Sequence, residues 1–589
     1  MTESPKPFDQ EAFSAEAKRA FCAENFLDWL SQNRFFRGHQ HHDAICRTLV
    51  ELHNRKEVDL LEPISGSQLG DGSGDDFWLV QDLYCTLIPE LETHTDPLID
   101  AVSRLVDRGG NDLASNRPNG AFFDWLRTRP EETKRLLGEG QQSSDSVKLL
   151  TFVLQAGATH SVAEYQAAAI DFLNNDIQAN RLAGVTALGR IDTSSNQKRH
   201  RKSLNSLSRH ALAATSGQEV AHTVSALLDV YARRPDIGKD RVSVTIEAAA
   251  QRPTPNLHYL LALSLGHNHN KFPNELQITI IKALRLADPS MKGVVDQIDF
   301  ALSQSLSEET QEAIADCLQA LLDHPQQPLN FSDLDSFTHK LITERPEALA
   351  WLIVRWLRFG THRARLSLPS LFRHFAEDGY ELKIALQDFG FSDQELIFIS
   401  RKTLGYFLLE SATAASILVS CLRASSSRSA AETISQLLFD PLMINFSGQA
   451  RGVVERQAKV KGKKRRYLQG ALKAHDEYLD GLRSVGDLPE MWPSASERQV
   501  QTELQRQQFA RSFIEAEKLS VFANLVTRQT LLHGEGSVYY MRAPDGQLHR
   551  SESLMSAHGT SIEFPRFETI DPVRFQHLIL RFRNETLNP

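Results

Sequence analysis

Apolar residues recur along most of the chain at the three- and four-residue spacing that places them on one side of a helix. The pattern is clearest over residues 161–191, where two short apolar stripes flank the polar stretch Asn174–Asp176. Ser161 and Glu164 have the spacing of a capping box, in which each side chain accepts a hydrogen bond from the backbone N–H of the other residue. The pattern therefore predicts two helices joined by a tight turn.

This predicted helix pair resembles a HEAT repeat. The second helix of that repeat usually opens with an aspartate followed by Val-Arg and runs into Ala-Leu-Gly, and this chain has Arg181 and the sequence Ala187–Gly189 at those places. Asn175 and Asn180 stand where Asp and Val are usual. The resemblance covers this repeat and, more loosely, its neighbours. It implies stacked helix pairs that share one continuous core and present an extended surface.

The same periodicity extends from Phe77 to about Leu438, and it predicts further helical units at residues 204–231, 242–265 and 276–302. Their spacing of about 35–40 residues is typical of HEAT-like arrays. We therefore predict a mainly α protein whose central part is a HEAT-like α-solenoid with a small C-terminal α+β domain. Its predicted parts are an N-terminal helical region (1–70), the repeat array (77–440), a basic helical segment (445–485) and the α+β domain (494–589).

Local signals predict where several of these elements begin and end. Ser392 with Glu395 and Ser429 with Glu432 repeat the capping-box spacing, and Pro130 and Pro346 fit the first turn of a helix. The Gly-, Ser- and Asp-rich stretch at 66–76 and the stretch at 484–493 are typical of linkers.

The C-terminal region changes character. A capping box at Ser494 and Glu497 predicts a long helix through about Leu531, with a core of Phe509, Phe513, Leu519, Phe522 and Leu525. The turn sequence Pro-Asp-Gly at 544–546, between two extended runs, predicts a β-hairpin. A third short strand is expected at 560–564 and a closing helix at 572–583.

Composition narrows the class of protein. Hydrophobic residues make up 41% of the chain and charged residues 24%, as in ordinary globular proteins. The five cysteines are far apart and form no Cys-x-x-Cys pair, which indicates a reducing compartment. The N-terminus is polar and no apolar run approaches the ~18 residues that a membrane span requires. We expect a cytoplasmic protein with no membrane contact.

The charge is unevenly distributed. The chain carries a net charge of −9, yet residues 451–473 hold nine Lys or Arg side chains against the single acid Glu455. On one continuous helix, Arg456, Lys459, Lys463 and Arg466 would form a positive stripe. Such an island predicts an anionic partner, DNA, RNA or an acidic protein. The candidate nucleic-acid-binding residues are Arg456, Lys459, Lys461, Lys463, Lys464, Arg465 and Arg466.

Two groups of histidines are candidate metal ligands, because imidazole and thiolate groups suit zinc. His39 and His42 precede Cys46, and His53 follows; His267 and His269 lie in a stretch expected to be a loop. Neither group has the spacing of a known metal motif, and the chain shows no nucleophile elbow, zincin or phosphate-loop motif. We therefore assign no metal, cofactor or catalytic residue.

Three functions remain open. The leading interpretation is a non-enzymatic scaffold or adaptor of a multi-protein system, which holds a protein partner on the solenoid surface and an anionic partner on the basic segment. The first alternative is a nucleic-acid-binding subunit of a DNA-processing or anti-phage defence system. The second alternative is an enzyme whose metal site is assembled from distant histidines such as His39, His42, His267 and His269.

Overall fold

The structure is a computed structural model that describes residues 8–33, 35, 39–65, 75–110, 113–139, 147–372, 380–486, 493–519, 526–531, 536–542, 548–554 and 567–587. The chain divides into two compact units. The first comprises residues 1–352 and 360–371, and the second comprises residues 353–359 and 372–589. Helices dominate both units, so the mainly α prediction is confirmed.

The first unit begins with eight helices around a common hydrophobic core. This core joins side chains from both sides of the glycine-rich stretch at 66–76, including Ile64 and Phe77. Its largest members are aromatic, among them Phe122 and Trp125, which stack with ring centroids 6.2 Å apart. The helices are α1 (Gln10–Cys22), α2 (Phe26–Gln32), α3 (His42–Asn54), α4 (Glu62–Ser65), α5 (Asp75–Leu87), α6 (Thr95–Gly109), α7 (Arg117–Arg127) and α8 (Pro130–Glu139).

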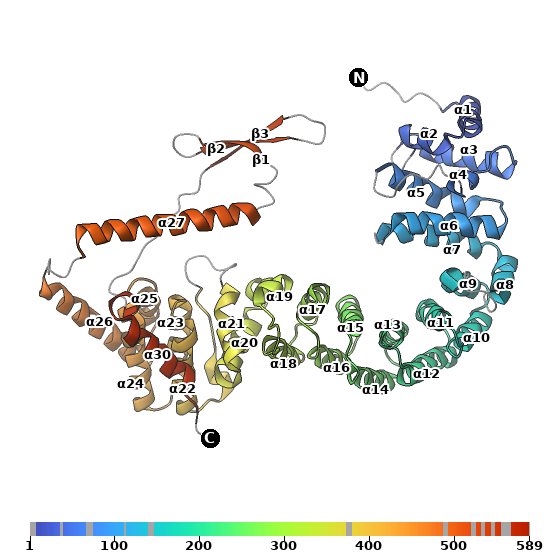
Figure 1. Cartoon of the computed structure of the whole chain (residues 1–589). Helices are drawn as coiled ribbons and strands as arrows, with labels where there is room; N and C mark the ends of the chain where they lie inside the picture. Colours follow the sequence, from blue (N-terminus) through green and yellow to red (C-terminus); the bar gives the residue numbers. More distant parts are fainter. Residues whose placement is uncertain are drawn as a thin grey trace. The chain divides into compact units, whose positions relative to one another are not determined.

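The rest of the first unit is an array of helix pairs (Figure 1). Helices α9, α11, α13, α15 and α17 pack side by side in one row, and α10, α12, α14, α16 and α18 follow each other in a second row. Each unit predicted from apolar spacing is a helix pair, while the HEAT-like assignment itself stays a prediction. The helices are α9 (Val147–Ala158), α10 (Val162–Phe172), α11 (Gln178–Arg190), α12 (Gln197–Ala213), α13 (Gly217–Arg233), α14 (Lys239–Ala250), α15 (Pro255–Asn268), α16 (Asn274–Leu284), α17 (Lys292–Gln304), α18 (Gln311–Leu322), α19 (Asp335–Thr343) and α21 (His362–Ser367). Helix α20 (Pro346–Phe359) is divided between the units, with residues 353–359 in the second.

Small residues let α11 approach α13 closely. Ala183 and Ala187 are buried, as their positions on the predicted stripe require. A Cβ atom placed on Gly189 would lie 2.9 Å from Cβ of Ala226 in α13, closer than two carbon atoms can stand without a shift. The Ala-Leu-Gly sequence is therefore a contact surface between neighbouring repeats.

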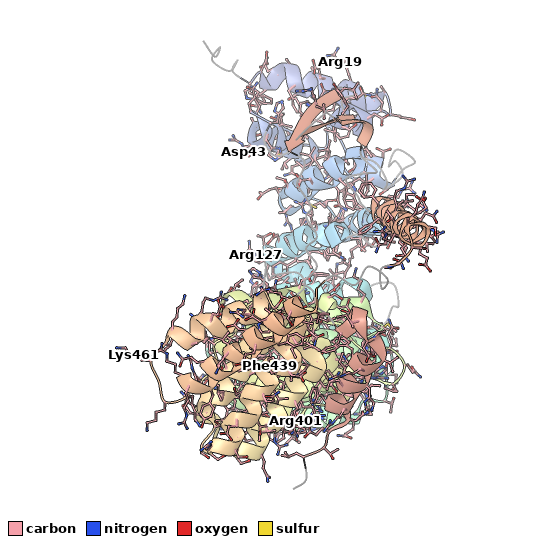
Figure 2. All side chains as sticks on the ribbon, turned by 90° about the vertical axis from the view of Figure 1, so that its left-hand side faces the viewer. Arg19, Asp43, Arg127, Arg401, Phe439 and Lys461 are labelled. Atoms are coloured by element: carbon pink, nitrogen blue, oxygen red, sulfur yellow. The ribbon has the colours of Figure 1, made fainter. Side chains whose placement is uncertain are left out.

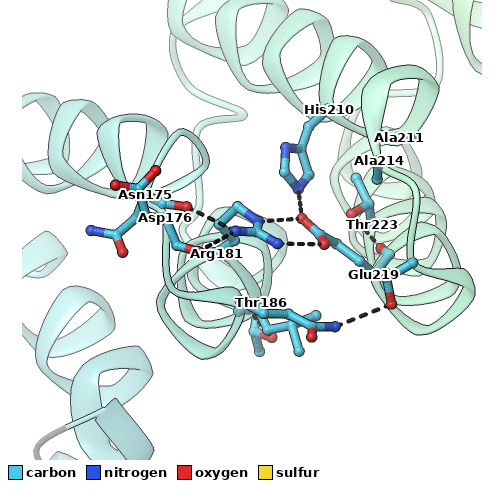
Figure 3. A network of polar contacts seen from close by, with 12 residues as sticks. Asn175, Asp176, Arg181, Thr186, His210, Ala211, Ala214, Glu219 and Thr223 are labelled. Carbon is cyan, nitrogen blue, oxygen red and sulfur yellow. Dashed lines mark hydrogen bonds and ion pairs between the residues drawn. The ribbon is translucent and has the colours of Figure 1, made fainter. Parts of the chain in front are cut away.

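A partly buried ion pair also links these helix pairs (Figure 3). The Arg181 guanidinium makes two bonds to the Glu219 carboxylate, Nε to Oε1 at 2.7 Å and Nη2 to Oε2 at 3.1 Å. Its Nη1 atom donates to the backbone carbonyls of Asn175 and Asp176, both at 2.9 Å, and so holds the turn after α10. Nε2 of His210 lies 2.8 Å from Glu219 Oε1. One arginine thus joins α11, the preceding turn and α13.

Capping signals in the sequence have mixed outcomes. Pro130 and Pro346 begin α8 and α20 as predicted, and Ser392 with Glu395 forms a complete capping box. Ser161 Oγ accepts a hydrogen bond from Glu164 N–H at 3.4 Å, which is one of the two bonds of the predicted box. The box predicted at Ser429 and Glu432 is wrong, because Ser427 takes the cap by accepting a hydrogen bond from Ala430 N–H.

The second unit is built on five helices and a returning C-terminal helix. These are α22 (Asp393–Phe407), α23 (Ser411–Ala424), α24 (Arg428–Leu437), α25 (Gln449–Lys459), α26 (Arg465–Val485) and α30 (Pro572–Asn584). Helix α30 packs against α22 and buries Phe575 and Phe582. The chain rejoins this unit at Phe567, in the short helix α29 (Phe567–Ile570), where its N–H donates to Asn445 Oδ1 at 2.8 Å.

Between α26 and α29 lie the helix α27 (Ala495–Leu519) and a three-stranded antiparallel sheet in the order β1-β2-β3. The strands are β1 (Val526–Leu531), β2 (Gly536–Arg542) and β3 (Leu548–Leu554), so the predicted hairpin is present. Its turn at 543–547 and the strand predicted at 560–564 lie outside the described residues.

Two expectations for this region are wrong. The helix predicted through Leu531 ends at Leu519, and residues 526–531, which are rich in β-branched side chains, pair with β2 instead. Phe509 and Phe513 are 72% and 74% exposed rather than buried in a core. The side chain of Leu519 and the residues Phe522 and Leu525, also predicted for that core, lie outside the described part of the chain. None of the helices in the described part of the chain is both long and apolar enough to cross a bilayer.

Candidate nucleic-acid interface

The basic segment is held in place by the buried faces of two helices. Helix α25 buries Ala450, Val453, Val454 and Ala458 and packs against α23 and α26. Helix α26 buries Leu468 and Ala471 and packs against α24. The cationic residues at 459–466 therefore lie between two helices that are anchored by buried apolar side chains.

The predicted basic segment is helical, but it is not one continuous helix. Helix α25 ends at Lys459, and Val460 takes an extended conformation (φ −73°, ψ 127°) with 54% of its surface exposed. Gly462, a poor helix former, follows, and its carbonyl accepts a hydrogen bond from Arg465 N–H at 3.2 Å. The predicted stripe is thus divided between the end of one helix, a loop and the start of the next.

Three of the nine basic side chains are engaged in ion pairs. Arg451 contacts Glu455 and Asp476, and the hydrogen bond with Asp476 raises the pKa of this arginine. Arg456, one of the seven candidate residues, donates from Nε to Glu381 Oε1 at 3.0 Å.

Lys473 is the third, with its ammonium group 3.6 Å from Glu477. The six remaining cations make no ion pair with any other residue in the described ranges: Lys459, Lys461, Lys463, Lys464, Arg465 and Arg466. We call these six residues the basic loop. In Figure 2 the side chain of Lys461 extends away from the ribbon.

Three cations of the basic loop lie at the N-terminus of α26, where the helix dipole makes positive charge unfavourable. Lys464 is the N-cap residue of α26, and Arg465 and Arg466 occupy its first turn, where carboxylates are favoured and cations are unfavourable. Two of these side chains lie over the ring of Tyr467, with Lys464 Nζ 5.6 Å and the Arg466 guanidinium carbon 4.7 Å from its centroid. Helix stability therefore does not explain this cluster, and positions that break a local rule are often functional.

The histidine groups do not assemble into a metal site. Nε2 of His42 lies 3.7 Å from Cys46 Sγ, but burial raises the pKa of this thiol to about 11 and so disfavours the thiolate that a metal binds. His53 Nδ1 accepts a hydrogen bond from Leu60 N–H at 3.2 Å. Across the residues with a described placement, no three His, Cys, Asp or Glu side chains are grouped so as to hold a metal ion.

The second histidine pair was expected in a loop, which is wrong for His267 and holds for His269, in the turn after α15. His267 lies inside α15, where its ring packs against Phe300 at 5.4 Å between centroids. His269 is the C-cap residue, and its Nδ1 lies 3.0 Å from the Gly266 carbonyl oxygen.

Sequence reasoning missed a second basic surface. Helix α12 contains no Asp or Glu over its whole length and carries five Lys or Arg residues: Lys198, Arg199, Arg201, Lys202 and Arg209. The signal was visible in the sequence Gln197–Lys202, which reads QKRHRK. The apolar spacing of Leu204, Leu207 and Ala211 predicts the helix but carries no information about the charge on its opposite face.

No protein-family model matches the chain, and no curated protein sequence is significantly similar to it.

Proposed function

We propose that this protein is a helical-repeat adaptor that binds nucleic acid through the basic loop. The observation that carries the proposal is the gathering of six cations without ion pairs between Lys459 and Arg466, on a chain whose net charge is −9. Lysine and arginine contacts to phosphates release condensed counterions, and this release drives sequence-independent binding.

A solvated charged surface is the main competing explanation. Solvated helices usually mix charges to gain ion pairs at three- and four-residue spacing. The same segment does so at Arg451 with Glu455 and at Lys473 with Glu477, on either side of the basic loop. The absence of such pairs within the basic loop, among described residues, therefore supports a partner that supplies the negative charge.

The test is a change of four exposed members of the basic loop that lie over no aromatic ring: Lys459, Lys461, Lys463 and Arg465, each to Ala. We expect the full chain to bind a fluorescent 30-base-pair duplex with log K falling linearly against log salt, by about 0.9 per neutralised phosphate. The quadruple variant should flatten this slope by about two to four and weaken all sequences alike, because phosphate contacts carry no base readout.

A matched control removes four cations that already have carboxylate partners. Arg55, Arg104 and Arg127 are exposed and Lys239 is partly exposed. They pair with Glu51, Asp100, Asp124 and Glu275, respectively. Their replacement by Ala changes the net charge equally and should leave the slope close to that of the wild type. An equal loss of binding in both variants would show a general charge effect and contradict the proposal.

A second candidate function, a scaffold for a protein partner, is favoured by α27. This helix exposes Phe509 and Phe513, although large apolar groups are costly to leave in water. Changing both to Ser should abolish binding of a defined partner, measured by co-purification of the two expressed proteins, while leaving duplex binding intact. The setting in a DNA-processing or anti-phage system stays a prediction.

A further inference from the structure

We infer that helix α12 forms a second phosphate-binding surface, which takes one strand of a nucleic-acid backbone. The inference rests on the proposed function for the identity of the ligand, but it uses none of the residues of the basic loop. Its residues lie in the first unit of the chain, and those of the basic loop lie in the second.

The outer face of α12 lines an open groove of about 580 Å³. Four cations lie along it, Lys198, Arg201, Lys202 and Arg209, and the remaining lining residues are Ile170, Gln197, Asn205 and Ser206. The groove lining therefore contains no carboxylate. Among described residues, the four cations have no ion-pair partner.

The opposite face of α12 is fixed to its neighbours, so the groove has a rigid floor. Leu204, Leu207 and Ala211 are buried. Ser203 Oγ accepts a hydrogen bond from Gln166 Nε2 at 2.7 Å, which ties α12 to α10. Ser208 Oγ lies 2.7 Å from Thr245 Oγ1, which ties it to α14. The cations are therefore presented outward from a helix that cannot rotate to shield them.

As in α26, the first turn of α12 is cationic and lacks an acid. Lys198 and Arg199 occupy positions where the helix dipole disfavours positive charge. The local cost of this arrangement is not offset by ion pairs within the described ranges. Helices α12 and α26 thus both have cations and no acid in the first turn, where the dipole favours negative charge.

The row of cations on α12 fits a nucleic-acid strand better than a small anion. The cations at 198, 201, 202 and 209 follow the three- and four-residue spacing of one helix face, so they form a row. At 1.5 Å per residue the row is about 16 Å long. One strand of duplex DNA carries about five phosphates over that distance, since they are spaced by about 3.4 Å along the axis.

The groove also fits phosphates better than an acidic protein. Protein interfaces usually have an apolar, desolvated centre surrounded by polar groups. Here Ile170 is the one large apolar residue among the lining side chains, while Asn205 and Ser206 add neutral groups able to donate to phosphate oxygens.

The experiment compares the full chain with a variant in which Lys198, Arg201, Lys202 and Arg209 are changed to Ala. We expect the slope of log K against log salt for the 30-base-pair duplex to flatten by about two to four. Amide hydrogen exchange of residues 197–213 should slow when the duplex is added to the wild type. The variant with R55A, R104A, R127A and K239A is again the control, and circular dichroism checks that each variant folds.

A second substitution keeps all four cations. Asn205→Glu places a carboxylate in the middle of the row, where it should weaken duplex binding about tenfold, whereas Asn205→Gln should not. These variants protect the test against a quadruple variant that fails to fold.

The outcomes separate this inference from the proposed function. If the α12 variant binds as the wild type does while the basic-loop variant loses binding, the inference is overturned and the proposed function stands. The reverse result overturns the basic loop as the interface and keeps α12. Polyglutamate that displaces the duplex from α12 at equal charge concentration would assign the groove to an acidic protein instead. A wild type that binds neither DNA nor RNA at about 50 mM salt overturns both.

Discussion

Gly405 and Arg583 are in direct contact although they lie 178 residues apart in the chain, because Arg583 Nε donates a hydrogen bond to the Gly405 carbonyl at 2.6 Å. Two neighbouring contacts reinforce it. The buried Lys402 donates from Nζ to the Arg583 carbonyl at 2.6 Å, and Arg401 pairs with Glu585 at 2.6 Å. The last helix of the chain is thus fixed to α22 by polar contacts as well as by Phe575 and Phe582.

Gly405→Val should displace α30 from α22. A Cβ atom at this position would lie 3.2 Å from Arg583 N and 3.3 Å from its Cγ, so the larger side chain forces the helices apart. We expect a loss of about 1–3 kcal/mol in unfolding free energy, as for other overpacked contacts. Hydrogen exchange in residues 572–584 should quicken. Gly481→Val in α26, where a Cβ meets nothing within 4 Å, is the control.

Ala187→Asp should destabilise the repeat array severely. Ala187 is fully buried, so a carboxylate there would lose its hydration. Burying an unpaired charge costs several kcal/mol, and we expect a clear fall in melting temperature. Ala163→Asp, on the exposed first turn of α10, should change stability by less than about 0.5 kcal/mol. Equal melting temperatures for the two variants would contradict the packing described for α11.

Glu219→Gln should cost about 2 kcal/mol, less than the 3–5 kcal/mol typical of a fully buried pair, because Arg181 remains partly exposed. Chemical denaturation measures the loss. The double variant Arg181→Met with Glu219→Gln should recover part of it, since no charge is then left unpaired. Arg428→Ala, which breaks an exposed pair with Glu432, should cause a much smaller loss, because solvent screens an exposed pair. A loss no larger than this for Glu219→Gln would show that the network of Figure 3 does not stabilise the array.

Asp393 should make stability depend on pH. Burial alone would raise its pKa, but hydrogen bonds from Ser427 and Ser426 outweigh burial and lower the pKa to about 2. Since the unfolded value is about 3.9, the ionised carboxylate stabilises the fold above that pH, and the contribution is lost as pH falls from about 4 to about 2. Asp393→Asn should cost about 1 kcal/mol at pH 7, because the neutral amide accepts fewer and weaker hydrogen bonds than the carboxylate. In urea titrations, the gap between variant and wild type should narrow at pH 3; a constant gap would contradict this assignment.

Local sequence patterns predicted the helices well, but they did not predict the contacts between residues far apart in the chain. The turn after α10 and the cap at Ser392 depend on residues a few positions apart, so the sequence contains the whole signal. Ser427 and Ser429 are equally good caps by pattern, and the choice between them follows from Asp393, whose carboxylate accepts hydrogen bonds from the Ser426 and Ser427 N–H groups. Such a contact over more than thirty residues leaves no local trace.

The sequence predicted the cluster of basic residues at the candidate site, but not the break between the two helices that carry it. The charge imbalance around Lys461 was evident from residue counts, whereas the break in the helix depends on Val460 and Gly462, which a charge count ignores. Arg456 illustrates the same limit, because its partner Glu381 lies 75 residues away. In α12 the apolar spacing predicts the helix but not the row of cations on its opposite face.

The return of the chain at Phe567 and the docking of α30 have a consequence for α27 and the three-stranded sheet. Residues 493–554 are an insertion within the second unit rather than a C-terminal tail, since the segments before and after them belong to the same packed set of helices. An inserted element is tethered at both ends, so it can explore less space than a tail of equal length and cannot be lost by trimming the C-terminus. The inserted segment could therefore be replaced by another one, in evolution or by design, while the helices that carry the basic loop keep their core.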